Sequence, residues 1–148
     1  MVEKIYIAAD HAGFKLKDEI KKWLHKKGIE FIDMGSHVLD PADDYPDYAV
    51  PLARKVAAAK SLGILVCGSA QGVCIAANKV RGARAVIPFS LEEVKLSREH
   101  NDANIICLSG WFMGMHKAKK MIELFLNTPF SKEPRHVRRV NKIKKLEQ

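Results

Sequence analysis

The sequence predicts an α/β fold: a three-layer α/β/α sandwich with a five-stranded parallel sheet, of the Rossmann-like type. Short apolar segments alternate along the chain with longer amphipathic ones, and strands that alternate with helices form parallel sheets covered on both faces. The chain has 148 residues, of which 47% are hydrophobic, and this suits one core of ordinary size. We therefore expect a single domain over residues 1–148.

The first half of the chain contains two predicted strand and helix pairs. Short apolar segments rich in β-branched residues predict strands at 4–9 and 29–34. Apolar side chains at helical spacing predict a helix at 14–27, and a second helix follows at 47–60. The loop before this second helix ends in three residues that break regular structure: Asp43, Asp44 and Pro46.

The same alternation continues in the second half. Apolar segments predict three more strands, at 63–67, 83–88 and 104–108. Helices are predicted after each of them, at 73–79, 91–100 and 115–125. Pro129 then interrupts the chain before a final basic helix at about 132–147.

Composition excludes several classes of protein. No apolar stretch approaches the roughly 20 residues that a membrane-spanning helix requires, so we expect no membrane segment. The N-terminus lacks the long apolar region and small-residue cleavage site of a secretory signal. The three cysteines, Cys67, Cys74 and Cys107, are odd in number and lack the pairing with histidine that a zinc site shows. They indicate reduced thiols and a cytoplasmic protein.

Positive charge is concentrated at the C-terminus. Residues 132–148 carry +5 of the net charge of +8. A basic end segment can bind nucleic acid or a small anion, but a solvated helix face is the simpler interpretation. The segment contains no aromatic residue on which bases could stack, so nucleic-acid binding is the least favoured function.

Three strand ends are expected to form one site. In parallel sheets, ligands bind beyond the carboxyl ends of the strands. The residues that follow the first, third and fifth strands should therefore meet at one edge: Asp10 and His11, Cys67 to Ser69, and Ser109 to Trp111.

The turn after the third strand has the composition of an anion-binding turn. Residues 67–72 read CGSAQG, and their small side chains let backbone N–H groups point at a ligand next to a helix N-terminus. A tight structural turn explains the same residues equally well. Cys67 is a candidate base because a helix N-terminus stabilises a thiolate, whereas Cys74 and Cys107 are interpreted as small apolar residues.

Histidines and arginines extend this candidate site. His11, His100 and His136 are placed for proton transfer or anion contacts, and with Cys67 and Asp10 they form an acid/base group. Arg135 and Arg139 lie four residues apart and so share one helix face, where they can supply positive charge.

Six segments in order and at matching spacing resemble the B-type ribose-5-phosphate isomerases, within the wider ribose, galactose and allose phosphate isomerase family. The segments are DHAG at 10–13, DYP at 44–46, GILVCGS at 63–69, IAANK at 75–79, SREHNDAN at 97–104 and RHVRR at 135–139. The resemblance covers essentially the whole chain. It implies an enzyme of carbohydrate metabolism, in the pentose phosphate pathway, that interconverts ribose 5-phosphate and ribulose 5-phosphate through an enediolate with no metal or organic cofactor.

The resemblance also implies a role for each matching residue. Cys67 would be the base that moves a proton from C2 to C1, and Ser69 would help move the hydroxyl proton. Backbone N–H groups from Gly68 to Gly72 would hold the enediolate oxygen. The remaining roles are ring opening by Asp10 and His100, sugar positioning by Tyr45 and Asn101, and phosphate binding by His11, Arg135 and Arg139. Members of the family form homodimers or dimer pairs, so we expect a homodimer, possibly a tetramer, with each site at the subunit interface.

Three positions separate this chain from family patterns. Some members carry a glutamate base where this chain has Val73, which leaves Cys67 as the candidate. The turn has Ala70 where glycine is usual, and Trp111 stands where an arginine usually contacts phosphate. These changes leave two alternatives open: an isomerase of allose 6-phosphate or galactose 6-phosphate, and a module that binds sugar phosphates without catalysis.

Overall fold

The computed structural model describes residues 4–147 and contains one five-stranded sheet. All neighbouring strands pair in parallel, in the order β2-β1-β3-β5-β4. The strands are β1 (Ile5–Ala9), β2 (Phe31–Asp33), β3 (Gly63–Cys67), β4 (Ala85–Val86) and β5 (Ile105–Ser109). The predicted α/β fold with a five-stranded parallel sheet is confirmed.

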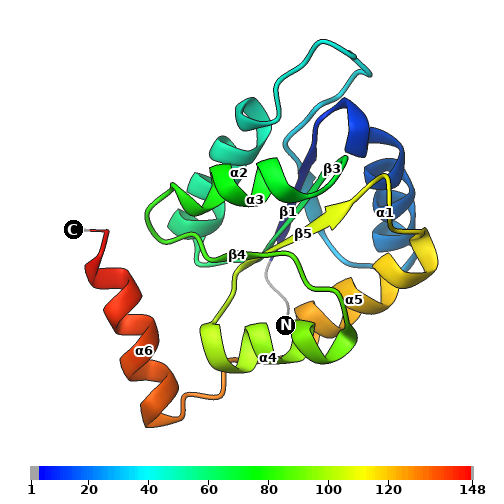
Figure 1. Ribbon diagram of the computed structural model, residues 1–148. Coiled ribbons are helices and arrows are strands. Elements are labelled where there is room, and N and C mark those ends of the chain that lie inside the picture. Colours follow the sequence, from blue (N-terminus) through cyan, green and yellow to red (C-terminus); the bar gives the residue numbers. More distant parts are fainter. Residues whose placement is uncertain (1–3, 148) are drawn as a thin grey trace.

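Helices cover both faces of the sheet (Figure 1). The helices are α1 (Phe14–Lys26), α2 (Pro46–Ala59), α3 (Gln71–Asn78), α4 (Leu91–Asn101), α5 (Met115–Asn127) and α6 (Pro134–Lys145), and a short 3-10 helix, η1, spans His11–Gly13. In the described part of the chain, no helix is long and apolar enough to cross a membrane.

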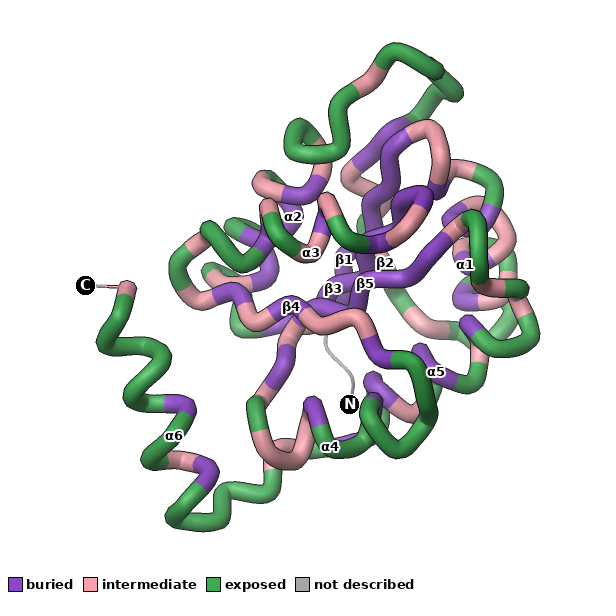
Figure 2. The backbone as a smooth tube through the Cα atoms, in the orientation of Figure 1, coloured by how far each residue is buried: buried purple, intermediate pink, exposed green. Residues whose placement is uncertain are grey.

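Side chains of β1 show how the layers are built. Ile5 and Ile7 pack into the cluster formed with α1, α4 and α5, whereas Tyr6 and Ala8 pack into the cluster formed with α2 and α3. The side chains alternate between faces because successive residues of a strand point to opposite sides. Strands β1, β3 and β5 are therefore buried on both faces and form the purple centre of Figure 2, whereas the edge strand β2 is partly exposed.

Two elements differ in extent from their predictions. Strand β4 contains two residues rather than the six of 83–88, and Pro88 has no N–H with which to continue a ladder. Helix α3 begins at Gln71, two residues earlier than predicted, because Ala70 adopts a left-handed conformation with φ of 69° and turns the chain directly into the helix.

The last helix stands apart from the sheet and its covering layers (Figure 1). Its beginning is tied to α4, where the Ser131 N–H donates to the Glu99 carbonyl oxygen at 3.1 Å. Beyond its end, the Glu147 carboxylate accepts the Gly82 N–H at 3.0 Å. Much of α6 between these contacts is exposed, including Ile143, whose relative exposure is 42%.

Candidate active site

The ends of β1, β3 and β5 meet at one edge, as predicted. The Gly110 N–H donates to the Cys67 carbonyl oxygen at 2.8 Å, and the Ser109 hydroxyl donates to that of Gly68 at 2.6 Å. A Cβ atom on Gly13 would lie 2.3 Å from the Val66 carbonyl oxygen. These contacts require the turns after β1 and β5 to sit directly against the end of β3.

Aromatic rings cover two glycines of the turn after β3. A Cβ atom on Gly68 would lie 2.5 Å from Cε2 of Trp111, and one on Gly72 would lie 2.6 Å from Cζ of Tyr45. Trp111 is nevertheless 67% exposed, so only part of its indole contacts the turn. The turn thus lies between two aromatic rings, one of which replaces the charged side chain expected from the family pattern.

Cys67 lies at the centre of this edge and is only 4% exposed. Burial raises the pKa of the thiol, and the nearby Asp10 carboxylate raises it further. Backbone N–H groups of Val73, Ala70 and Gly72 lower the pKa, as expected for a helix N-terminus, but by less. The sequence-based expectation of a stabilised thiolate is therefore wrong for the single chain, because desolvation outweighs the helix N-terminus.

Asp10 and His11 lie beside Cys67, and a third residue joins them. The Asp10 carboxylate accepts the Gly13 N–H at 3.1 Å and caps η1, and burial raises the pKa of this carboxyl. Nδ1 of His11 lies 2.6 Å from Oδ1 of Asp43. The sequence predicted Asp43 only as a residue that breaks regular structure. Its position in the loop after β2, at the same edge of the sheet, was the available signal.

Asp10, His11 and Asp43 are also the residues that could hold a metal ion, since one ligand atom from each lies within 4.8 Å of the others. The separation of 2.6 Å between His11 Nδ1 and Asp43 Oδ1 is that of a charge-assisted hydrogen bond. A proton therefore joins these two side chains, and their arrangement fits a hydrogen-bonded pair better than two ligands of one ion.

Four predicted site residues lie elsewhere in the single chain. His100 and Asn101 end α4, and the chain then enters β5 at its first residue, Ile105. They therefore lie at the amino edge of the sheet, opposite Cys67. Arg135 and Arg139 lie on the exposed part of α6, which is tied to the same end of α4. Ser69, by contrast, remains next to Cys67, and its hydroxyl accepts the Gln71 N–H at 3.3 Å.

His100 belongs to a cluster at the start of α6. Its ring centroid lies 4.1 Å from that of His136, which is 2% exposed and shares a hydrogen bond of 2.8 Å with the Ser131 hydroxyl. Burial and the neighbouring His100 lower the pKa of His136. His136 therefore supports the His100 ring, whereas sequence analysis placed it in the acid/base group.

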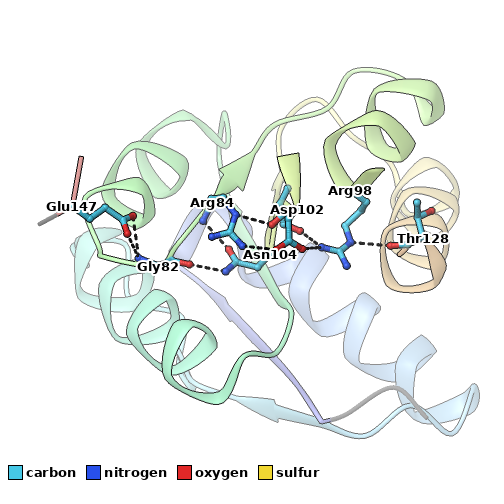
Figure 3. Close-up of polar contacts among 8 residues, drawn as sticks. Gly82, Arg84, Arg98, Asp102, Asn104, Thr128 and Glu147 are labelled. Carbon is cyan, nitrogen blue, oxygen red and sulfur yellow. Dashed lines mark hydrogen bonds and ion pairs between the residues drawn. The ribbon is translucent and has the colours of Figure 1, made fainter. Parts of the chain in front are cut away.

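A polar network fixes Asp102, the residue that follows Asn101 in the chain (Figure 3). Asp102 accepts hydrogen bonds from Arg84 at 2.9 Å and from Arg98 at 3.4 Å. Arg98 also donates to the Thr128 carbonyl oxygen at 3.0 Å. The arginine and the aspartate of the SREHNDAN segment thus have a structural role. Asn101 itself lines a cleft of about 590 Å³ between α6 and the sheet's amino edge.

Comparison with known proteins gives a consistent result. A family model described as Ribose/Galactose Isomerase matches residues 5–143. The chain is 44% identical over 144 residues to the probable ribose-5-phosphate isomerase B of Mycoplasma pneumoniae, covering 97% of this chain and 94% of the relative. It is 42% identical over 139 residues to ribose-5-phosphate isomerase B of Mycobacterium tuberculosis, covering 93% and 86%. The crystal structure of ribose-5-phosphate isomerase B from Mycoplasma genitalium with bound ribulose-5-phosphate matches with a TM-score of 0.93 and 40% identity, covering 99% of this chain and 98% of that one.

Proposed function

The chain belongs to the ribose/galactose isomerase family, and on that premise we propose that it interconverts ribose 5-phosphate and ribulose 5-phosphate with Cys67 as the base. The relatives named above carry this activity in their names, and one of their structures holds the ketose product. The observation that carries the assignment of the base is the position of Cys67, buried at the edge where β1, β3 and β5 end and beside Asp10. We propose that residues 1–148 form a single domain, and the three free thiols favour a cytoplasmic enzyme.

The proposed reaction moves one proton between neighbouring carbons. The Cys67 thiolate removes the proton from C2 of the open-chain aldose, and the electron pair of that C–H bond forms the C1–C2 double bond of an enediolate. The proton of the C2 hydroxyl moves to O1 with the help of Ser69. The resulting thiol of Cys67 returns its proton to C1, which leaves a ketone at C2 and regenerates the thiolate. Asp10 and His100 transfer protons during ring opening, and Tyr45 positions the sugar.

Backbone N–H groups at the start of α3 have two proposed roles. Those of Ala70, Gly72 and Val73 favour the charged form of Cys67. Donors of the same turn, from Gly68 to Gly72, stabilise the negative charge of the enediolate oxygen. Both roles suit a site with little water, where a fixed N–H dipole interacts strongly with an anion.

We propose that the site is completed by a second copy of this chain. Cys67 lies at the carboxyl edge of the sheet, whereas His100, Asn101, Arg135 and Arg139 lie at or near the amino edge. In a homodimer, one protomer can supply each half, so that positive charge from the partner faces Cys67. Such charge favours the thiolate, which the single chain disfavours through burial.

A direct assay tests the proposed reaction. Purified protein is offered ribose 5-phosphate, allose 6-phosphate and galactose 6-phosphate in parallel, and ketose formation is measured. We expect turnover of ribose 5-phosphate that is lost in Cys67→Ala and retained in Cys74→Ala, the matched control on α3. Turnover by Cys67→Ala would reject the base. Turnover of only a hexose phosphate would favour the alternative substrates, and binding by calorimetry without any turnover would favour the non-catalytic module.

Mixing two variants tests the shared site. Cys67→Ala and the double variant Arg135→Ala/Arg139→Ala are dissociated, mixed in equal amounts, reassociated and assayed below the wild-type KM. If the two halves come from different protomers, half of the dimers are hybrids with one intact site each, and about a quarter of wild-type activity returns. If one protomer supplies all of these residues, every site in the mixture carries a defect and no activity returns.

A further inference from the structure

Asp43 is a residue that the function proposed above leaves without a role, although its side chain makes a close contact at the carboxyl edge. Its Oδ1 lies 2.6 Å from Nδ1 of His11 and also accepts the His11 backbone N–H at 3.1 Å. The side chain of Asp43 is 5% exposed, whereas that of His11 is 36% exposed. A buried carboxylate is therefore hydrogen-bonded to Nδ1 of a partly exposed imidazole.

The loop around Asp43 is held by its own hydrogen bonds. The Asp43 N–H donates to the Asp40 carbonyl oxygen at 3.1 Å, and the Ala42 N–H donates to Oδ1 of Asp40 at 2.9 Å. After the loop, the Asp47 N–H donates to the Asp44 carbonyl oxygen at 3.1 Å and leads into α2. The contact with His11, 32 residues away in the chain, is therefore made by an ordered loop.

The environment of the second carboxylate oxygen of Asp43 indicates that His11 is protonated. Oδ2 is buried and forms no direct hydrogen bond among residues 4–147, although the Tyr48 phenol of α2 interacts with the same carboxylate. A buried carboxylate with an unpaired oxygen is costly unless a positive charge lies next to it. The imidazolium form of His11 supplies that charge, so the packing of Asp43 favours a protonated His11.

The surroundings of His11 act in the same direction. The hydrogen bond that His11 donates to Asp43 raises the pKa of His11, burial lowers it, and the charges of Asp10, Asp43 and Asp40 raise it again. Tyr48 of α2 also faces Asp43, and the pKa of its phenol is raised by burial and by the Asp43 carboxylate. With Nδ1 bound to Asp43, the opposite ring nitrogen, Nε2, is left as a donor for a ligand.

We infer that Asp43 is a positioning residue that holds His11 with Nε2–H directed toward the phosphate of the substrate. This inference rests on the proposed function and deepens it, because it assigns the orientation of one phosphate ligand. His11 is the phosphate ligand that the carboxyl edge itself supplies, since Arg135 and Arg139 come from α6. The neutral Trp111 supplies no charge there, so the orientation and protonation of His11 contribute to the positive charge that this edge offers to a phosphate.

Kinetics of three variants test the inference. Asp43→Ala removes the contact, Asp43→Asn keeps an acceptor but removes the charge, and Asp44→Asn, at an exposed side chain of the same loop, is the control. We expect KM for ribose 5-phosphate at pH 8 to rise about tenfold in Asp43→Ala and less in Asp43→Asn, with kcat nearly unchanged, which corresponds to about 1.4 kcal/mol of binding. The Asp44→Asn variant should keep the wild-type KM. Equal KM values in all four proteins would overturn the inference.

Nitrogen NMR of the imidazole gives a readout that a purely structural role would not move. His11→Gln identifies the His11 signals, and each protein is titrated with pH and with inorganic phosphate. In the wild type, we expect Nδ1–H to persist, a pKa above that of free histidine, and a phosphate-dependent shift at Nε2. In Asp43→Ala, the pKa and the phosphate shift should both fall.

The two measurements separate the inference from the proposed function. If no sugar phosphate is converted but phosphate shifts Nε2 in the wild type and not in Asp43→Ala, the isomerase proposal fails while the positioning role stands. If the enzyme is active but the His11 signals are identical in wild type and Asp43→Ala, the positioning role is rejected. Should Asp43→Ala fail to fold in thermal unfolding, the same comparison is made with Asp43→Asn, for which unchanged signals have the same meaning.

Discussion

Replacing Gly13 by alanine tests how tightly η1 is fitted against β3. Gly13 has φ of −97° and ψ of −5°, a conformation that alanine adopts easily, so backbone strain does not contribute. A Cβ atom would, however, lie 2.3 Å from the carbonyl oxygen and 2.4 Å from the carbonyl carbon of Val66, and 2.9 Å from the Cys67 nitrogen. All three atoms belong to the backbone of the central sheet, which cannot rotate away as a side chain can.

The expected cost follows from this rigidity. Adding a methyl group to a well-packed site usually destabilises a protein by about 1–3 kcal/mol. Because the added methyl group would meet backbone atoms of Val66 and Cys67 rather than a movable side chain, we expect Gly13→Ala to lower the free energy of unfolding by about 3 kcal/mol. For a chain of this size, that corresponds to a melting temperature about 6–12 °C lower. The shift of η1 would also move Asp10 away from Cys67, so kcat should fall as well.

Gly68→Ala is the matched control. Its Cβ atom would meet ring atoms of Trp111 at 2.5, 2.6 and 2.7 Å, contacts as short as those of Gly13. Trp111 is 67% exposed, so its side chain can turn into solvent, and we expect a loss of less than about 1 kcal/mol. Urea unfolding followed by circular dichroism measures both variants. A Gly13→Ala variant within about 0.5 kcal/mol of wild type would refute the reasoning.

Three further predictions concern the buried ion pair, the thiol and the contact between strand ends. Lys17 is 2% exposed and lies 2.9 Å from Asp33, so Lys17→Met should lower the free energy of unfolding in urea by about 3 kcal/mol. Lys21→Met changes a more exposed side chain and should lower it by less than about 1 kcal/mol. Equal losses would contradict the role of burial. Burial raises the pKa of Asp33, but the hydrogen bonds from both lysines outweigh it and hold the pKa below 3.8, so this stabilisation is present above about pH 4 and is lost as pH falls through the folded pKa. In the dissociated single chain, alkylation of Cys67 by iodoacetamide, followed by peptide mass spectrometry, should rise with pH and reach its midpoint above that of an ordinary thiol. Fast reaction of the single chain at pH 7 would show that its thiolate is stabilised instead. Ser109→Ala removes hydrogen bonds of 2.6 and 3.0 Å, so we expect a loss of about 2 kcal/mol in thermal unfolding, and an unchanged melting temperature would contradict it.

Features that depend on neighbouring residues are the ones that the sequence predicts correctly. The strand at 63–67 was predicted with the bounds it has in the structure, because five consecutive apolar residues are typical of a strand buried on both faces. The meeting of three strand ends followed from topology, since parallel strands all end at one edge. The position of Cys67 at that edge therefore follows from the sequence alone.

Tertiary structure decided at which edge of the sheet each site residue lies and in which direction the pKa of Cys67 shifts. His11 and Asp43 are 32 residues apart, and no local pattern shows that their side chains meet at 2.6 Å. The direction of the pKa shift of Cys67 depends on how much burial outweighs the helix N-terminus, which only the packed structure reveals. Placement of His100 at the opposite edge follows from the direction of α4. Periodicity along the chain determined which segments form the sheet, whereas contacts between distant segments determined which side chains share a site.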